Sequence, residues 1–339
     1  MASLPAGKLP AELLRALLAS LPAFDPSVVV GARFGEDAAV IDVGGPELLV
    51  AKTDPITFAA EDVGRYLLAV NGNDLATVGA EPRWLLVTAL LPEGIPAERA
   101  TEIFDDLRRA CAEADVTLVG GHTEMTVGLD RPILVGCLLG TVPRHRLVRT
   151  SGARVGDAIV LAGGIAIEGT AILAREHADA LCARGVPETV IEVAAGWLRS
   201  PGISVLPAAR ALHATGAVHA MHDPTEGGLV TALHELAEAA GVGLRIERAA
   251  VPILPECRAV CRALALDPLG LLASGALLAA LDGVEVPAAL DRLRAAAIPA
   301  AIIGEVVSLT EGRMFVEAGR VSPLPVFARD ELARYLETR

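Results

Sequence analysis

The sequence has 339 residues, a formal net charge of -13 and 53% hydrophobic residues. A chain of this length exceeds one ordinary hydrophobic core, so two domains are expected. The acidic balance argues against nucleic acid as a partner, because a phosphate backbone requires a basic surface. The longest uncharged apolar run, residues 268–281, is interrupted by glycines and is too short to cross a bilayer, so no membrane segment is expected.

The first elements and the cysteines predict a cytoplasmic protein. Residues 1–21 place Glu12 and Arg15 inside a leucine stripe, a pattern typical of an amphipathic helix rather than a signal peptide. No zinc-binding spacing joins the cysteines, so they are predicted to be buried thiols in a reducing compartment. These cysteines are Cys111, Cys137, Cys182, Cys257 and Cys261.

Two short strands then lead to candidate ligands. A strand at residues 28–30 and a glycine-broken loop precede Glu36 and Asp37, which open a strand that runs through Ile41. The next strand, residues 48–51, ends in Lys52, Thr53 and Asp54. Arginine occurs 27 times and lysine twice, and a compact ammonium suits a phosphate that a forked guanidinium does not fit.

A helix is predicted from Ala60 until Gly79 and Pro82 end it. Asn71 and Asp74 fall on its apolar face, where an amide and a carboxylate cost several kcal/mol unless they are satisfied. Two interpretations are open for them. One is a polar knot bonded to nearby backbone, and the other is a metal or phosphate ligand.

A second glycine motif follows in the same half of the chain. The pattern predicts strands at 85–91, 116–119 and 133–142 and a helix at 96–114. The middle strand runs directly into Gly120, Gly121, His122, Thr123 and Glu124. Two glycines after a strand allow backbone amides to approach a ligand closely.

Residues 144–157 are basic, contain glycines and lack apolar periodicity. We therefore place a domain boundary near Thr150, which gives domains 1–150 and 151–339. The second half carries an acidic diglycine turn, residues 222–228, between a strand and a helix. Neither half alternates strictly between strand and helix, so the predicted class is α+β in both domains. The predicted helices are 167–177, 188–199, 205–213, 229–240, 255–264 and 288–297, and the strands 158–162, 217–221, 243–247, 276–281, 301–306 and 314–316.

Five acids stand at strand ends, glycine turns or the inward helix face: Asp37, Asp54, Asp74, Glu124 and Asp223. Oxygen-only ligands select hard cations, magnesium above all, and protein-bound magnesium is usually shared with substrate phosphates. With Lys52 and the glycine turns, a nucleoside triphosphate is the indicated ligand. Phosphoryl transfer, which depends on positioning and charge neutralisation, is the indicated reaction.

These motifs together resemble the aminoimidazole ribonucleotide synthetase (PurM-like) superfamily, which includes thiamine-monophosphate kinase, selenophosphate synthetase and the hydrogenase maturation factor HypE. The resemblance covers nearly the whole chain and is greatest to HypE, because DPTEGGL is similar to its DPTRGGL. The motifs occur in order as GEDAAV (35–40), KTDP (52–55), NDLATVGAEP (73–82), GGHTE (120–124), DPTEGGL (223–229), LLASGALL (271–278) and IGEV (303–306).

The resemblance implies a two-domain cytoplasmic enzyme whose N-terminal domain binds ATP and Mg²⁺ and forms a homodimer through its sheet. The γ-phosphate would activate or phosphorylate a substrate oxygen, with a hydrogenase-maturation protein as a possible partner. The implied metal ligands are Asp37, Asp54, Asp74 and Asp223, and the implied catalytic residues are Asp74, Lys52 and Asp223. The implied ATP-binding residues are Asp37, Lys52, Thr53, Asp54, Asn71, Gly120, Gly121, His122, Thr123, Glu124, Asp223, Glu226, Gly227 and Gly228.

Three departures from the HypE pattern leave the acceptor unnamed. His122 stands where those relatives carry an aspartate, with Glu124 as the candidate replacement. Glu226 replaces an arginine and inverts a charge. HypE ends in a cysteine that receives a carbamoyl group, whereas the last cysteine here is Cys261. Two alternatives are therefore kept: a small-molecule kinase of the thiamine-monophosphate type, and a regulatory module that binds nucleotide without turnover.

Overall fold

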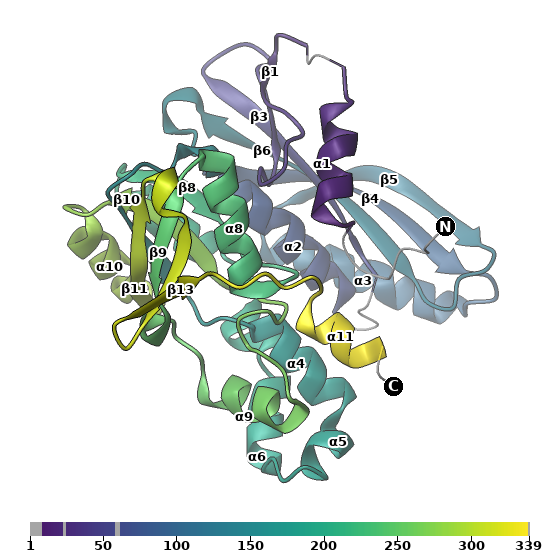
Figure 1. Ribbon diagram of the computed structural model, residues 1–339. Helices are drawn as coiled ribbons and strands as arrows, with labels where there is room; N and C mark the ends of the chain where they lie inside the picture. The colour runs from purple at the N-terminus through teal and green to yellow at the C-terminus, as the bar shows by residue number, and fades with distance from the viewer. Residues whose placement is uncertain (1–8, 23–24, 58–61, 338–339) are drawn as a thin grey trace. The chain divides into compact units, whose positions relative to one another are not determined.

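The computed structural model describes residues 9–22, 25–57 and 62–337 and contains two compact units. The N-terminal unit comprises Phe24–Gly31 and Asp37–Leu147, and the C-terminal unit comprises Met1–Ala23, Ala32–Glu36 and Val148–Arg339. Each unit packs helices against one mixed sheet (Figure 1), so the predicted α+β class is confirmed.

The N-terminal unit is built on a six-stranded sheet in the order β1-β2-β3-β6-β4-β5. Neighbouring strands are antiparallel except β4 and β5, which are parallel and leave β5 as an edge. The strands are β1 (Val28–Val30), β2 (Ala39–Ile41), β3 (Glu47–Ile56), β4 (Glu81–Pro92), β5 (Thr117–Thr126) and β6 (Ile133–Pro143).

Helix α2 (Val63–Thr77) packs on this sheet, and α3 (Ala97–Glu113) packs against α2. Glycine in the sheet allows the close approach of α2, because a Cβ on Gly136 would lie 2.8 Å from Nδ2 of Asn71. The predicted start of α2 at Ala60 lies outside the described residues, and its end at Thr77 is followed by Gly79 with φ of +78°. The glycine stop is the one that the sequence predicts.

The C-terminal unit contains a seven-stranded sheet in the order β13-β12-β9-β11-β7-β10-β8, with only β12 and β9 parallel among its paired strands. Helix α8 (Gly228–Ala240) packs on one face of the sheet, where its Leu233 and Leu236 join Ile159 and Ile246 of the sheet in a fully buried core. The strands are β7 (Asp157–Ala162), β8 (Val218–His222), β9 (Gly243–Glu247), β10 (Leu277–Asp282), β11 (Ala300–Val307), β12 (Arg313–Glu317) and β13 (Arg320–Pro323).

Helices α7 and α10 contact each other and strands of the same sheet, while α4, α5, α6 and α9 pack together as a separate group (Figure 1). Helix α1 (Ala11–Ala19) also belongs to this unit, where Arg15 pairs with Glu238 of α8 at 2.6 Å. The remaining helices are α4 (Ile167–Glu176), α5 (Ala178–Cys182), α6 (Glu188–Ala195), α7 (Leu206–His213), α8 (Gly228–Ala240), α9 (Pro255–Leu264), α10 (Val286–Ala295) and α11 (Glu331–Glu337).

Several element bounds differ from the predicted ones. Strand β3 continues to Ile56, and β5 continues to Thr126, so Lys52–Asp54 and the GGHTE motif lie inside strands rather than in loops after them. Pairing explains both extensions, because β3 is bonded to β6 as far as Ile56 and β5 follows β4 to Pro92. Strand β13 and helix α11 are absent from the sequence-based prediction.

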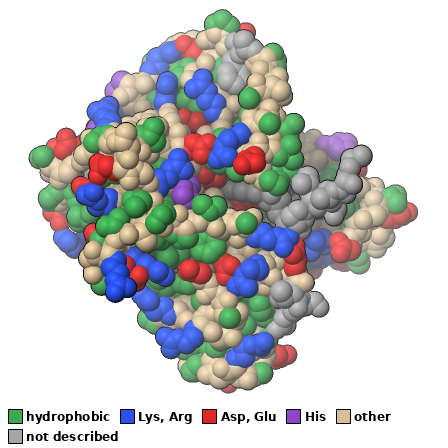
Figure 2. Space-filling model, viewed as in Figure 1, with side chains coloured by type: hydrophobic (Ala, Val, Ile, Leu, Met, Phe, Trp, Pro, Cys, Tyr) green, Lys and Arg blue, Asp and Glu red, His purple; other side chains and the backbone are tan. Residues whose placement is uncertain are grey.

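Among the helices in the described part of the chain, none is both long and apolar enough to cross a membrane. On the face drawn in Figure 2, acidic and basic side chains are interspersed rather than gathered into one basic surface.

Candidate active site

The candidate site of the N-terminal unit is built on strand β3 and helix α2. Lys52 and Asp54 stand two residues apart on β3 and therefore share one face, whereas Thr53 points to the other face. The ammonium of Lys52 lies 2.7 Å from Oδ2 of Asp74 on α2 and 3.2 Å from Oδ2 of Asp54. The structure thus brings together three predicted site residues from two separate elements.

The charge of Asp37 also acts on Lys52. Burial lowers the pKa of Lys52, but the charges of Asp74, Asp54 and Asp37 together with the hydrogen bond to Asp74 outweigh it, so the pKa lies well above its ordinary value. Lys52 therefore stays cationic throughout the working pH range and cannot serve as a general base. Its charge is fixed in place by carboxylates on two elements.

Asn71 has a local structural role. Its Oδ1 accepts a hydrogen bond of 2.8 Å from the backbone N–H of Asp54, and its Nδ2 donates to Leu67 O at 2.9 Å. The side chain is fully buried, and these bonds satisfy a buried amide as burial requires. The polar-knot interpretation accounts for Asn71, which fastens α2 to β3 and so sets the spacing of Lys52 and Asp74.

The donor set suits a hard cation. Carboxylate oxygens of Asp54 and Asp74 lie within 3.2 Å of the Lys52 ammonium, and the charge of Asp37 also acts on it, so negative charges outnumber the positive one. Carboxylate oxygens are the ligands that magnesium selects, and magnesium commonly shares one or two of them with phosphate oxygens. These residues would hold the metal if magnesium binds here.

The GGHTE motif lies elsewhere on the same sheet. Asp54, Gly136, Val87 and Gly121 are in register across β3, β6, β4 and β5. Three strand spacings separate Asp54 from Gly121, a distance of roughly 14 Å. Within one chain, the motif is therefore not part of the Lys52 cluster, and only an extended ligand would touch both.

Side chains of the GGHTE motif are exposed on the edge strand β5. His122 Nε2 lies 3.2 Å from Oε2 of Glu124, and Thr126 donates to Oε1 of the same carboxylate at 3.1 Å. Thr123 alternates to the opposite face. Gly121 has φ of +148°, and a Cβ there would lie 1.8 Å from the carbonyl oxygen of Val87, so this position admits only glycine.

In the C-terminal unit, the predicted Asp223 follows strand β8 and is buried with His222, each 4% exposed. Nε2 of His222 donates to Oε2 of Glu235 on α8 at 3.0 Å, which fixes the orientation of the imidazole. His222 and Glu235 were not among the predicted site residues. The position of His222 directly before Asp223 is the signal that points to it.

The glycine turn before α8 is surrounded by acids. Gly227 N–H donates to Oδ2 of Asp330 at 2.7 Å, and Glu226 lies close enough to raise the pKa of both Asp330 and Glu168. Burial raises the pKa of Glu168 to about 7, against a hydrogen bond with Ser274 that lowers it. Asp330 and Glu168 were also missed, because no local pattern links residues 168, 226 and 330.

Comparison with known proteins accounts for both units. Residues 35–142 match the N-terminal domain, and residues 154–317 the C-terminal domain, of the AIR synthase related protein family. The chain is 32% identical over 323 residues to carbamoyl dehydratase HypE of Cupriavidus necator, covering 92% of this chain and 86% of that one.

The chain belongs to the AIR synthase related family. It is an enzyme of the PurM–HypE superfamily, as the resemblance of its motifs predicts.

Solved structures agree with this assignment. The hydrogenase maturation protein HypE in complex with ATP superposes with a TM-score of 0.71 at 27% identity, covering 88% of this chain and 90% of that one. A HypE–HypF complex has a TM-score of 0.75 at 22% identity over 94% of this chain and 100% of that one, a likeness of fold. Thiamine-monophosphate kinase from Stenotrophomonas maltophilia K279a likewise shares the fold, with a TM-score of 0.67 at 23% identity over 92% and 96% of the two chains.

Proposed function

We propose that this enzyme binds ATP with magnesium and uses the γ-phosphate to activate or phosphorylate a substrate oxygen, in a reaction of the hydrogenase expression and formation type. The observation that carries the proposal is the cluster of Lys52 with Asp37, Asp54 and Asp74. A permanently charged ammonium among carboxylates serves phosphate recognition and metal binding together.

The residues of the cluster have separate tasks in this proposal. Asp74 and Asp54 hold the Lys52 ammonium in position before any ligand arrives, which lowers the entropic cost of aligning it with a phosphate. Lys52 neutralises charge on the phosphate oxygens without exchanging a proton. Bound magnesium would neutralise the same oxygens and orient them, and Asp37, Asp54 and Asp74 would hold it. Asp223 of the C-terminal unit, buried at the end of β8, is proposed as a further metal ligand.

Relatives support the proposed use of ATP, and exposed side chains on one strand support the proposed dimer. The HypE protein whose solved structure is 27% identical to this chain binds ATP. The relative from Cupriavidus necator is named as a carbamoyl dehydratase and belongs to the same family. A homodimer through the N-terminal sheet is supported by exposed apolar side chains on edge strand β5, because such an edge favours pairing with another strand. Leu118 is 39%, Val119 52% and Met125 55% exposed. A hydrogenase-maturation protein is the proposed further partner.

The test has a binding arm and an acceptor arm. Calorimetry should show ATP binding in the presence of magnesium and its loss with a chelator or in Lys52→Met, while the exposed control Arg108→Met binds normally. Mass spectrometry after incubation with Mg-ATP should then show ADP formed with a carbamoylated-cysteine peptide and not with thiamine monophosphate. The reverse preference would identify the kinase alternative, and tight ATP binding without ADP would identify the regulatory one.

A further inference from the structure

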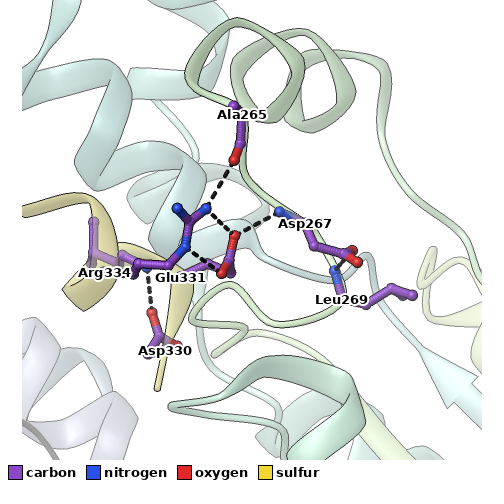
Figure 3. A network of polar contacts seen from close by, with 7 residues as sticks. Ala265, Asp267, Leu269, Asp330, Glu331 and Arg334 are labelled. Carbon is purple, nitrogen blue, oxygen red and sulfur yellow. Dashed lines mark hydrogen bonds and ion pairs between the residues drawn. The ribbon is translucent and has the colours of Figure 1, made fainter. Parts of the chain in front are cut away.

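Residues 324–337, here called the C-terminal strap, follow β13, include helix α11 and lie on other segments of the C-terminal unit. Figure 3 shows one anchor of the strap, in which the Glu331 carboxylate accepts hydrogen bonds from the backbone N–H of Asp267 at 2.9 Å and from Arg334 at 2.7 Å. Arg334 also donates to Ala265 O at 2.8 Å. This anchor pairs an anion with a cation, so its charges balance.

Asp330 forms a second anchor, and its partners are backbone amides. Its Oδ2 accepts from Gly227 N–H at 2.7 Å, its Oδ1 accepts from Leu332 N–H at 2.7 Å, and the backbone N–H of Leu272 is a further donor. Within the part of the chain that the structure describes, no lysine, arginine or histidine forms an ion pair with this carboxylate. Unlike the first anchor, this one is formed by hydrogen bonds to neutral groups.

Glu168 of helix α4 brings a second carboxyl group close to Asp330. The Glu168 side chain is buried, with 9% of the residue exposed, and it forms a hydrogen bond with Ser274. The charges that act on it are those of Glu226 and Asp330, both negative. Glu226 directly precedes Gly227, the residue whose amide donates to Asp330. Three acids from α4, the turn before α8 and the strap therefore lie near one another.

The loop before β10 holds these three segments together. Leu272 O accepts from the backbone N–H of Gly169, the neighbour of Glu168, at 3.0 Å, while Leu272 N–H donates to Asp330. The next residue of the loop donates to Thr225 O, in the turn before α8, at 3.2 Å. Backbone hydrogen bonds therefore fix the approach of the three acids, independently of their side-chain rotamers.

Cations close to this cluster in sequence have other partners. Arg175 of α4 donates to a carbonyl oxygen of α6 at 2.8 Å, and Arg329 of the strap pairs with Glu337. The ring of His177, which follows α4, packs edge-on against the ring of Tyr335 in α11, with centroids 5.1 Å apart. These three groups do not offset the negative charge of the cluster.

The other elements around α4 and the strap present few titratable groups. The buried faces of α5 and α6 are apolar. Helix α9 presents Cys257 and Cys261, whose sulfurs are 3.9 Å apart, and the loop after it presents Asp267, whose carboxylate accepts from a backbone N–H at 2.9 Å. His234 of α8 donates to Pro325 O at the start of the strap. Because burial lowers the pKa of His234, its ring is neutral at neutral pH and adds no positive charge.

Docking of the strap is linked to protonation of this cluster. Burial raises the pKa of Glu168 to about 7 and the pKa of Asp330 to about 6, and the charge of Glu226 adds to both effects, against hydrogen bonds that lower them. When the strap leaves, the Asp330 carboxyl enters water and its charge no longer acts on Glu168. The docked state therefore binds more protons than the undocked state in this pH range.

We propose that the C-terminal strap is a pH-gated element, which stays docked while at least one of Glu168 and Asp330 is protonated and is released as both carboxyls ionise. The direction follows from the raised pKa of each group: the advantage of the docked state is complete at acidic pH and is lost as the pH rises through about 6 for Asp330 and about 7 for Glu168. The balanced anchor at Glu331 does not share this dependence.

Amide hydrogen exchange of wild type, measured in steps from pH 5 to pH 8, tests the proposal without a substitution. Protection factors of residues 325–337, corrected for the intrinsic pH dependence of exchange, should fall by up to about tenfold per pH unit for each proton released on opening. Helix α10 of the same unit lacks these acids and should keep its protection. A parallel fall in α10 would show general unfolding of the unit, and a strap whose protection does not depend on pH would be purely structural. Either result would overturn the proposal.

Glu168→Gln then identifies the group that carries the pH dependence. Glutamine keeps a partner for Ser274 but cannot ionise, so the strap of this variant should retain about tenfold more protection than that of wild type at pH 8. Glu176→Gln, which changes an exposed acid of the same helix, is the matched control and should follow wild type. Identical strap protection in Glu168→Gln and wild type across the pH range would contradict the proposal, and the wild-type series decides if the variant does not fold. No nucleotide is present in either experiment, so the outcome is independent of the proposed ATP-dependent function.

Discussion

The Lys52 ammonium lies 2.7 Å from the Asp74 carboxylate and joins strand β3 to helix α2. This pair explains why a carboxylate occurs on the inward face of an otherwise apolar helix, since a buried charge is retained when it is paired. The acids considered alone predict mutual repulsion that Asp74→Asn would relieve, but the cation between them makes Asp74 an attractive partner.

Asp74→Asn should therefore destabilise the protein without ligand. The substitution keeps the shape of the side chain but removes the charge nearest to Lys52, whose side chain is only 24% exposed. Asp54 still faces Lys52 at 3.2 Å, so we expect a loss of about 1–3 kcal/mol in the free energy of unfolding, less than for a fully isolated buried charge. Urea denaturation measures it.

Asp54→Asn is the matched comparison, because it removes a carboxylate of the same cluster that is farther from Lys52 and 34% exposed. Its cost should be the smaller of the two. The stabilisation that Mg-ATP gives should shrink in both variants, because ligand binding to the native state raises the melting temperature. An Asp74→Asn protein that keeps the whole ligand-induced shift would limit Asp74 to a structural role.

Lys52→Met should convert the cluster into a stronger site for magnesium alone. Without the ammonium, Asp37, Asp54 and Asp74 repel one another, and a divalent cation relieves that repulsion. Thermal melts should show magnesium chloride raising the melting temperature of Lys52→Met by several degrees more than that of wild type. Calcium and sodium chloride at equal ionic strength separate specific binding from screening, and an equal response in both proteins would argue against a shared carboxylate site.

Gly121→Ala should disrupt the pairing of β4 and β5. A Cβ at this position would lie 1.8 Å from the Val87 carbonyl oxygen, and φ of +148° is unsuited to alanine. We expect a loss of more than about 3 kcal/mol in unfolding free energy or failure to fold. Gly120→Ala is the control, because its Cβ would meet only a Leu86 methyl at 3.9 Å. Similar denaturation midpoints for the two variants would contradict the register in which β5 pairs with β4.

Periodicity and turn residues in the sequence predict most of the elements that form the sheets. The structure contains the predicted helix, which has Asn71 and Asp74 on its inward face and ends before a glycine. It also contains the predicted strand next to Lys52 and Asp54, although that strand is longer than predicted. Strand ends are less predictable, because β3 and β5 extend as far as their neighbours supply hydrogen-bond partners. No residue inside a strand indicates where its partner ends.

Within the site, the sequence indicates which residues are chemically unusual but not how they pair. Lys52 stands out by its rarity and Asp74 by its place on an apolar face, yet their contact depends on how α2 packs on β3. Asp330 and Glu168 could not be predicted, because helix α11 is short and meets the glycine turn through contacts about 100 residues apart in sequence. Such contacts leave no periodic pattern.

Glu168 should make the protein less stable as the pH rises. Its pKa is raised by burial from 4.5 to about 7, so the folded state binds more protons than the unfolded state between these values. A depressed carboxylate pKa would give stability at higher pH. A raised one has the opposite sign, and stability is lost as the pH rises from about 4.5 through 7. One pKa unit corresponds to about 1.4 kcal/mol, so this residue contributes about 3 kcal/mol at most.

Glu168→Gln tests this, because glutamine keeps a partner for Ser274 but never ionises. Urea denaturation at pH 5 and pH 8 should show the variant gaining stability relative to wild type at pH 8, while the two differ little at pH 5, where Glu168 is protonated in the folded state. Glu188→Gln, an exposed acid in the first turn of α6, controls for the general loss of one negative charge. Equal slopes of stability against pH in wild type and Glu168→Gln would show that the buried carboxyl is not protonated near neutral pH, and the acidic surroundings of Asp330 would then need another counter-charge.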